Sequence, residues 1–348
     1  MRQIVLLISI LSLLGILLTV AYTSGHSVAY QYGDVINTSD QATAQTSTSS
    51  KLFVVGDVFL GRAVERILDT HGLDYSYKQL DGLWSTEDVV LANFEAAIPT
   101  THTPTPDFGF QFSVRSDIAA QLVSHGFTHV SLANNHSYDF GRSGYRGTKE
   151  ALAQTGLQAW GDVTAGTSSV TYVEQGGISI ALVALTTVGI KYNDAVYTDL
   201  VRSAKDQADY VLVYIHWGTE YERTSNVAQQ TLAHDLITAG ASTIVGHHPH
   251  VVQEIGWYDG VPIFYSLGNF IFDQYFSADV QEGLMLAIDF SDTSITYTLH
   301  PVTSILSRSQ PRLMSSYERD IWLEDLAKRS DEKVQSAITS GTLHQSRP

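Results

Sequence analysis

The stretch Leu52-Phe53-Val54-Val55-Gly56-Asp57 places an aspartate directly after a short apolar run. Its length and β-branched content indicate a buried strand. Two further apolar runs also end in polar residues. Val89–Glu95 ends in Asn and Glu, and Val130–His136 ends in Asn and His. Open α/β sheets bind their ligands at the carboxyl ends of the strands. The chemistry of this chain is therefore expected where its strands end.

Apolar runs alternate with amphipathic segments along most of the chain. We expect strands at Leu52–Val55, Val89–Ala92, His129–Ala133, Ile178–Leu185, Tyr210–Ile215, Ser242–Val245 and Ile263–Ser266. We expect helices at Asp117–His125, Gly144–Thr155, Asp199–Asp209 and Asn226–Ala239, with Asp117 and Asn226 as caps. This order predicts a layered α/β domain with parallel pairing. Gly283–Phe290 and Ser294–His300 predict a terminal antiparallel hairpin, and Ser315–Ser340 predicts one or two surface helices.

Two later strands also end in polar groups. Val211–Ile215 leads into His216 and Glu220, and Thr243–Val245 leads into His247-His248-Pro249-His250. Buried His, Asp and Glu side chains must be paired or coordinated, so five such strand ends favour a metal site. In an extended segment alternate residues point the same way, so two imidazoles around Pro249 can reach one centre or two neighbouring ones.

Each of these side chains also has an ordinary explanation. His216 fits a core histidine, His247 a surface one and Asn134 a turn residue. Their joint placement favours a divalent metal, either Mn, Fe, Zn or Mg, as one or two ions. Two-metal sites serve displacement at phosphorus.

Composition narrows the functional classes. The 348 residues carry a formal charge of −16 and contain no cysteine. The absence of cysteine excludes disulfides, thiolate metal sites and cysteine nucleophiles. The acidic balance, with no basic run, argues against nucleic acid as a partner.

The N-terminal residues predict a membrane-associated protein. An apolar run over 4–22 follows Arg2, and its length favours an uncleaved signal anchor, with a cleaved signal peptide as the alternative. The weak positive-inside signal places the main domain outside a single-pass cell membrane, or secreted after cleavage. We therefore expect an anchor or signal at 1–22, a Ser/Thr/Gln-rich tether at 23–50, one domain at 51–305 and a polar helical extension at 306–348.

Six ordered motifs resemble the CapA (PgsA) family of capsule and poly-γ-glutamate biosynthesis proteins, which is similar to calcineurin-like metallophosphoesterases. They are Gly56–Arg62, Asn93–Glu95, Ala133–Gly141, His216–Tyr221, Gly246–Val251 and Tyr265–Phe270. The resemblance implies a four-layer α/β/β/α sandwich of the metallophosphoesterase type with its metal site at the strand ends.

The resemblance also implies roles for individual residues. The metal ligands would be Asp57, Glu95, Asn135, His216, His248 and His250. His136 would protonate a leaving oxygen, Asp139 would orient His136, and Arg62 would hold an anionic group. Substrate contacts are expected from residues around the metal site: Asn134, Trp217, Glu220, Tyr221, His247 and Asn269.

One departure from the broader phosphoesterase pattern stands out. Those enzymes usually open with Asp-x-His, whereas Asp57-Val58-Phe59 has a phenylalanine in the second ligand's place. Phenylalanine cannot coordinate a metal. One metal centre is therefore expected to be poorer in ligands.

Two kinds of function follow from these motifs. One is a surface-anchored, metal-dependent hydrolase acting on a phosphoester or on a wall or capsule polymer. The other is a non-catalytic accessory subunit that binds poly-γ-glutamate or assists its membrane synthase. An acidic chain that grips a polyanion needs help from metal ions or from arginines such as Arg62, Arg115 and Arg142.

Overall fold

Two β-sheets pack face to face in the computed structural model, which describes residues 50–107 and 109–347. Within these residues one sheet has nine strands and the other has six. The larger sheet runs in the order β14 (Arg312–Leu313), β13 (Ser294–Thr303), β12 (Glu282–Phe290), β1 (Leu52–Val58), β2 (Val89–Phe94), β3 (His129–Ser131) and β4 (Gln158–Trp160), with β11 (Asn269–Ile271) beside β1 and β15 (Thr342–Ser346) beside β13. The smaller runs β5 (Val170–Gln175), β6 (Ile178–Thr186), β7 (Tyr210–His216), β8 (Thr243–His247), β10 (Val261–Phe264) and β9 (Ile255–Tyr258).

The expected strand pairing is confirmed. Strands β1 to β4 pair in parallel, and so do β6, β7, β8 and β10. The predicted hairpin is β12 with β13, whose antiparallel register runs from Phe290 opposite Ile295 to Glu282 opposite Thr303. The carboxyl ends of the parallel strands therefore gather at one edge of each sheet.

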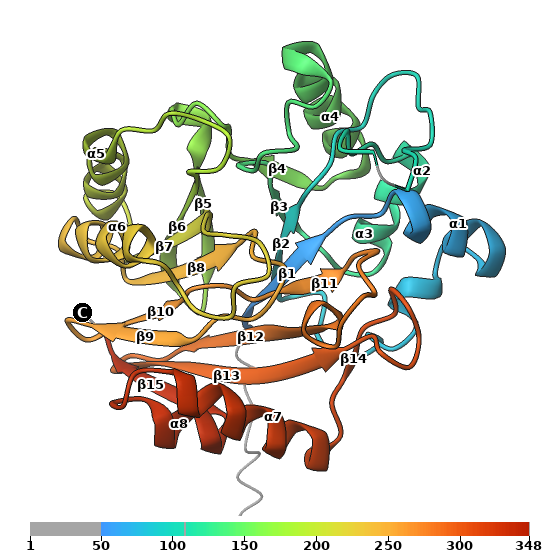
Figure 1. Ribbon diagram of the computed structural model, residues 1–348. Helices are drawn as coiled ribbons and strands as arrows, with labels where there is room; N and C mark the ends of the chain where they lie inside the picture. The colour runs from blue at the N-terminus through green and yellow to red at the C-terminus, as the bar shows by residue number, and fades with distance from the viewer. Residues whose placement is uncertain (1–49, 108, 348) are drawn as a thin grey trace, which may run out of the picture. The chain divides into compact units, whose positions relative to one another are not determined.

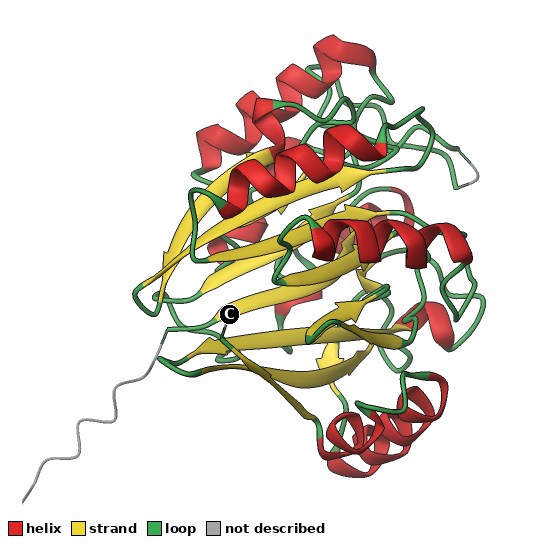
Figure 2. Ribbon diagram, turned by 90° about the vertical axis from the view of Figure 1, so that its left-hand side faces the viewer, coloured by secondary structure: helices red, strands yellow, loops and turns green. Residues whose placement is uncertain are grey.

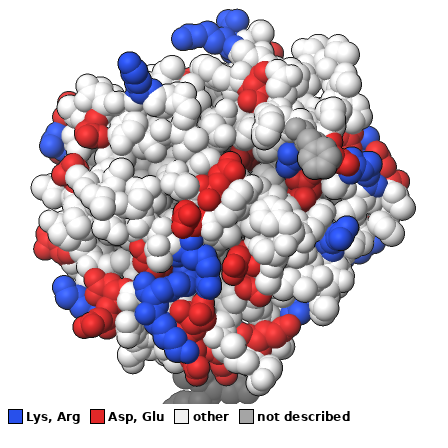
Figure 3. All heavy atoms as spheres, viewed as in Figure 1, with Lys and Arg blue, Asp and Glu red and all other residues white. Residues whose placement is uncertain are grey.

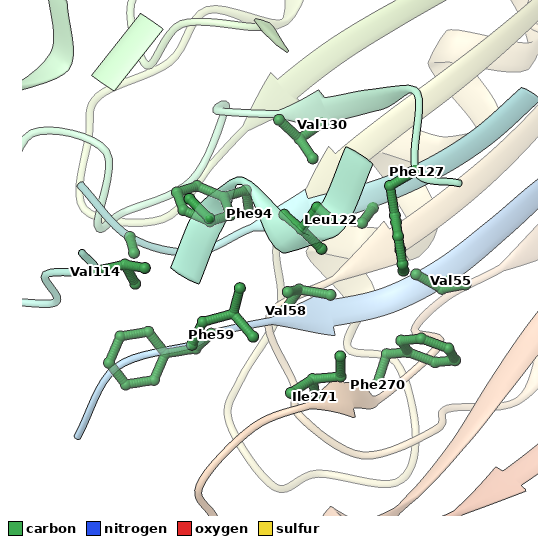
Figure 4. Close-up of a cluster of buried hydrophobic side chains, with 14 of the residues drawn as sticks. Val55, Val58, Phe59, Phe94, Val114, Leu122, Phe127, Val130, Phe270 and Ile271 are labelled. Atoms are coloured by element: carbon green, nitrogen blue, oxygen red, sulfur yellow. The ribbon is translucent and has the colours of Figure 1, made fainter. Parts of the chain in front are cut away.

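Side chains of each strand alternate between two cores. In β1, Leu52 and Val54 point between the sheets, whereas Phe53 and Val55 point outward. Strands β6 and β7 alternate in the same way. Figure 4 shows part of the outer core on the larger sheet, where Phe59 and Phe94 lie near the strand ends. Because both faces of both sheets are covered, the sequences of these strands are continuous apolar runs without polar alternation.

Helices cover the outer faces. α1 (Arg62–His71), α2 (Ser116–Ala119), α3 (Gln121–Ser124) and α4 (Gly141–Thr155) lie against the larger sheet, and α5 (Asp194–Lys205) and α6 (Val227–Thr238) against the smaller (Figure 1). Figure 2 shows these helices outside the strands. The described residues thus stack as helix, sheet, sheet, helix.

Several helices differ from the sequence prediction. The helix expected at Asp117–His125 is divided into two short helices at Ala120, although Ala120 keeps helical backbone angles. α5 begins at Asp194, ahead of the predicted 199, because the side chain of Asn193 accepts a hydrogen bond from the Ala195 amide. Helix α1 was not predicted, since its apolar residues are few. The cap at Asn226 is confirmed by its bond from the Gln229 amide.

The C-terminal segment packs onto the sandwich. α7 (Ser316–Arg329) and α8 (Gln335–Ser340) add Leu323, Leu326 and Ile338 to the core between the sheets. Strand β15 then pairs with β13. The one or two helices expected at Ser315–Ser340 are two, and the domain boundary placed near residue 305 stays a sequence prediction.

The predicted anchor and tether, residues 1–22 and 23–50, lie outside the described residues except for Ser50. In the part of the chain that is described, no helix combines the length and apolar composition needed to cross a bilayer.

Candidate metal centre

Strand register brings the candidate ligands together. Asp57 of β1 lies opposite Asn93 of β2 on one side and Asn269 of β11 on the other. In the smaller sheet His216 of β7 lies opposite His247 of β8. Asp57 contacts His247 directly. The edges that carry the strand ends of the two sheets therefore meet at one site.

Two glycines let the backbones approach closely here. A Cβ at Gly56 would lie 2.0 Å from the carbonyl oxygen of Gly268, and one at Gly246 would lie 2.0 Å from that of Tyr265. No side chain fits at either distance. The Gly-Asp and Gly-His pairs of the motifs thus set the strand spacing that places Asp57 and His247.

Asp57 lies at the centre of the site and contacts several of its residues. Its carboxylate is fully buried and lies 3.3 Å from Nδ1 of His247 and 3.2 Å from Nδ1 of His250. It also accepts hydrogen bonds from the Asn93 side chain at 2.8 Å and the His248 amide at 3.3 Å. Burial alone would raise the pKa of Asp57, but the hydrogen bonds and charges of His247 and His250 outweigh it and hold that pKa well below its ordinary value.

Asn93 is one of the predicted polar strand ends, but sequence reasoning gave it no role in the site. Its Nδ2 lies 3.2 Å from Nδ1 of His216, and its Oδ1 accepts a 3.1 Å bond from Asn134. Asn93 therefore joins Asp57 of one sheet to His216 of the other. The available signal was its place opposite Asp57 at the end of a parallel strand.

Three groups of side chains offer ligand atoms within 4.8 Å of one another. They are Glu95 with His216 and His248, Asp57 with Glu95 and His250, and Glu220 with His248 and His250. The first two are buried, whereas Glu220 is exposed. Glu95 and the two histidines of the His-Pro-His segment are shared between groups. Such sharing is what two neighbouring metal positions would require.

The donor atoms fit a divalent cation. Oε1 of Glu95 and Nδ1 of His248 are buried without a hydrogen-bond partner, an arrangement that is costly unless an ion or water satisfies them. Burial lowers the pKa of His248 to about 4 and holds that of His216 well below its ordinary value. Both imidazoles are therefore neutral near pH 7, the form that coordinates metals.

The carboxyl of Glu95 and the imidazole of His250 both have raised pKa values. Burial raises the pKa of Glu95 well above its usual value. Burial would lower the pKa of His250, but Glu95 and Asp57 outweigh it and raise that pKa to about 9. A metal that enters beside these groups must compete with the protons that they hold.

The His-Pro-His segment is a turn and is not extended as expected. His248 and His250 have φ values of +96° and +59°, and their ring centres lie 6.0 Å apart. Positive φ is uncommon for histidine and costs energy, so the surrounding contacts must hold it. Both imidazoles still reach the same cluster.

The predicted acid and its partner form a close pair. Nδ1 of His136 lies 2.8 Å from Oδ2 of Asp139, and Nε2 lies 3.7 Å from Oε1 of Glu95. Asn135 reaches the cluster through its Oδ1, which lies 2.7 Å from Nε2 of His216. The geometry thus places His136 at the edge of the metal-capable group.

Other predicted residues occupy supporting positions. Asn134 bonds the Phe94 carbonyl and receives the amide of His136. Oδ1 of Asn269 lies 3.0 Å from Nδ1 of His250. Trp217 is buried and donates to the Tyr265 carbonyl at 2.8 Å.

Tyr221 and Arg62 lie at the rim of the site. Tyr221 is 44% exposed, and its hydroxyl accepts a bond from Gln274 at 3.1 Å. Arg62 makes a bidentate ion pair with Asp273, at 2.9 and 2.5 Å. This pairing, which the sequence did not predict, neutralises the Arg62 guanidinium.

Other basic side chains at the surface are also paired with acidic ones. Lys and Arg lie in small groups beside Asp and Glu on the face seen in Figure 3. Arg115 is within salt-bridge distance of Glu65, Asp69 and Asp117. Of the arginines considered for a polyanion, Arg62 and Arg115 are thus already paired.

A groove of about 520 Å³ lies apart from these residues. Its walls include the exposed apolar side chains Ile305, Leu306, Tyr317 and Ile321. None of the metal-capable residues lines it.

The chain matches a known protein family over most of its length. The family described as bacterial capsule synthesis protein PGA_cap matches residues 51–274. The chain belongs to this family. The predicted relationship is thus confirmed, and the matched residues include every metal-capable side chain of the cluster.

Several relatives have names that refer to capsule or polymer synthesis. The chain is 33% identical to the PGA biosynthesis protein CapA of Bacillus subtilis over 239 residues, which are 63% of this chain and 62% of that protein. It is 32% identical to the capsule biosynthesis protein CapA of Bacillus anthracis over 243 residues, 64% of this chain and 59% of that one. The matches thus span less than two thirds of these Bacillus proteins. A third relative, the "Probable polyglutamine synthesis accessory protein MT0602" of Mycobacterium tuberculosis, is 28% identical over 281 residues, 63% of this chain and 73% of its own length.

Solved structures resemble the PGA_cap chain more distantly. A novel phosphatase from Mycoplasma pneumoniae has a TM-score of 0.45 at 15% identity, over 76% of this chain and 92% of its own. A hypothetical protein from Thermus thermophilus has a TM-score of 0.43 at 17% identity, over 76% and 98%.

Proposed function

We propose that this protein acts in the synthesis or export of a capsule polymer such as poly-γ-glutamate, through a metal-dependent hydrolase site of the metallophosphoesterase type. The observation that carries the proposal is the buried cluster of Asp57, Glu95, His216, His248 and His250, which lies wholly inside the PGA_cap match. Buried carboxylate and imidazole atoms without partners suit a catalytic metal better than they suit a packed core.

The ligands would be Asp57, Glu95, Asn135, His216, His248 and His250. A bound divalent metal would supply Lewis acidity and a water nucleophile at neutral pH. Glu220 stands beside His248 and His250. Its carboxylate is the candidate to replace the ligand that Phe59 cannot provide.

His136 would act as the general acid of the proposed reaction. Asp139 holds Nδ1 of its ring, so the opposite nitrogen, Nε2, faces the cluster and can give a proton to a leaving oxygen. The backbone amide of His136 is held by Asn134. Arg62 would orient an anionic substrate only if the substrate competes with Asp273.

The proposed location is the outer side of the cell membrane. Residues 1–22 would anchor the chain and residues 23–50 would tether the domain, with secretion as the outcome if the anchor is cleaved. The expected partners are the membrane, the polyanionic polymer and subunits of its membrane synthase. A divalent metal would also help an acidic surface to accept a polyanion.

A non-catalytic accessory role is the second candidate. The name of the M. tuberculosis relative describes an accessory protein. In this case the metal cluster would hold the polymer or the fold and would cleave nothing.

Hydrolysis assays separate the two candidates. The full-length chain is purified in detergent and assayed with a chromogenic phosphodiester, a phosphomonoester and poly-γ-glutamate, beside His248→Ala. The hydrolase proposal expects metal-dependent turnover of at least one substrate and its loss in the variant. Polymer binding without turnover in either protein would reject hydrolysis and support the accessory role.

Localisation has its own test. Deleting residues 1–22 is expected to move the chain from the membrane fraction to the soluble fraction. Protease added to intact cells should digest the domain of the undeleted chain. A chain that stays protected in intact cells and is cut only after lysis would contradict the outer location.

A further inference from the structure

An aromatic stack supports the His136 ring. The Phe112 ring lies parallel to the His136 imidazole, with ring centres 3.7 Å apart and an interplanar angle of 6°. Phe59 in turn lies against Phe112 at 4.3 Å and 18°. Phe59 occupies the second ligand's position of the Asp-x-His pattern, and it belongs to the core shown in Figure 4.

Phe112 also holds the partner of His136. Its backbone N–H donates a 2.6 Å hydrogen bond to Oδ2 of Asp139. This same oxygen lies 2.8 Å from Nδ1 of His136. Because a carboxylate only accepts hydrogen bonds, Nδ1 carries the proton in this pair. One residue therefore fixes the plane of the imidazole with its ring and the position of the carboxylate with its amide.

Phe112 is itself held firmly. The side chain is 6% exposed. Its carbonyl accepts the amide of Ala97, and the next residue, Ser113, forms a β-bridge with Ala97. The Arg62 guanidinium, fixed by Asp273, lies 4.4 Å from the centre of the Phe112 ring. The stack is thus tied to the strand end that carries Asp57.

We propose that Phe112, backed by Phe59, is a positioning residue that fixes the imidazole plane of His136 and its bond to Asp139. Rotation of the imidazole would break both the stacking and the Nδ1–H bond, so Nε2 stays directed at the cluster. The phenylalanine of Asp-x-Phe then has a role of its own, since it extends the stack beneath the acid. The catalytic consequence rests on the proposed function, whereas the positioning itself does not.

The first test observes His136 without any assay of activity. Full-length chains with isotope-labelled histidine are compared by NMR, and the Nδ1–H resonance is assigned by its absence in His136→Gln. We expect a solvent-protected Nδ1–H signal in the wild type and in Phe112→Tyr, which keeps the ring. In Phe112→Leu the signal should be lost to exchange. Phe127→Leu is the matched control, because Phe127 is 2% exposed in the same core and its ring contacts are with Tyr77, Trp84 and Phe270.

Each NMR outcome decides the inference. A protected signal that persists in Phe112→Leu, or is absent from the wild type, overturns it. Loss in both leucine variants would mean general loosening of the core and overturns it as well. Loss in Phe112→Leu alone, with the signal retained in Phe112→Tyr, supports it.

The second test is kinetic and depends on the proposed function. A misplaced general acid should lower kcat about tenfold or more for a phosphodiester with an alkyl leaving group, which needs a proton. KM and the rate with a nitrophenyl leaving group should change little. An equal loss with both leaving groups would contradict the role in acid catalysis. A wild-type chain without hydrolysis would reject the proposed function, and the NMR result would still decide the stack.

Discussion

At the scale of single residues, His248 and His250 lie two positions apart and have opposite pKa shifts. Burial lowers the pKa of His248 to about 4, whereas the nearby carboxylates, opposing burial, raise that of His250 to about 9. His248 is ready to coordinate at neutral pH, but His250 carries a proton. Metal binding should therefore be linked to proton release at His250 and Glu95.

This linkage predicts a pH-dependent metal affinity. A proton competes with the metal below the pKa of His250, so affinity should rise about tenfold per pH unit from about pH 7 and level off near pH 9. Calorimetric titration in buffers of different ionisation enthalpy should show about one proton released per ion. His250→Gln should bind more weakly and with a flatter pH profile. A wild-type affinity that does not change between these pH values would contradict the proton assignment.

Asn93 offers a second residue-scale prediction. Asn93→Ala removes one hydrogen bond from the buried carboxylate of Asp57 and one from the buried amide of Asn134, which should cost about 1–3 kcal/mol of unfolding free energy. Metal affinity should fall roughly 10–100-fold, as is typical when a residue that orients ligands is removed. Denaturant unfolding and metal titration measure the two effects.

The matched control is Asn193→Ala. It removes the N-terminal cap of α5, so it should cost about 1 kcal/mol without changing metal affinity. If both variants lose stability and neither loses metal affinity, Asn93 has only a structural role.

At the scale of secondary-structure elements, the sequence predicted the long strands well. Strands β1, β6, β7 and β8 are β-branched runs buried on both faces, and such runs carry a strong signal. Strand β11 has only three residues and pairs with β1 through long-range contacts. Nothing local predicts it. Helix α1 was missed because it is short and has few apolar residues.

Helix α7 gives a direct test of the C-terminal packing. Leu323 is fully buried in the core cluster that includes residues of both sheets, whereas Ile321 in the same helix is 53% exposed. Leu323→Ala should lower the unfolding free energy by about 3 kcal/mol, because it opens a cavity in the core. Ile321→Ala should change it by no more than about 0.5 kcal/mol. Equal and small losses would mean that α7 does not pack on the core in solution.

The site itself was only partly predictable from strand ends. Asp57, Glu95, His216 and the His-Pro-His pair were identified because they follow buried strands, and the structure brings them together. The bridging role of Asn93 depends on strand register, and the pairing of Arg62 with Asp273 joins residues 211 positions apart. The stack on His136 comes from Phe112, which lies in a loop without a periodic pattern. Contacts of this kind arise only in the folded chain.

At the scale of the whole molecule, the formal charge of −16 opposes a polyanion. Poly-γ-glutamate binding should therefore depend on bound divalent metal and weaken several-fold or more when a chelator removes it. Without metal, any remaining affinity should fall further as salt is lowered, because repulsion is then less screened. Fluorescence anisotropy of labelled polymer at two salt concentrations measures this. Binding that is unchanged by the chelator would mean that the polymer is held elsewhere.

The metal content of the purified full-length chain is the most direct test of the account. Elemental analysis after dialysis should find one or two divalent ions per wild-type chain. His248→Ala, which removes a ligand shared by two of the three groups, should lose most of them while its circular dichroism spectrum stays the same. A folded wild-type chain without stoichiometric metal, even after incubation with Mn, Fe, Zn and Mg, would contradict the claim that these strand ends form a metal centre.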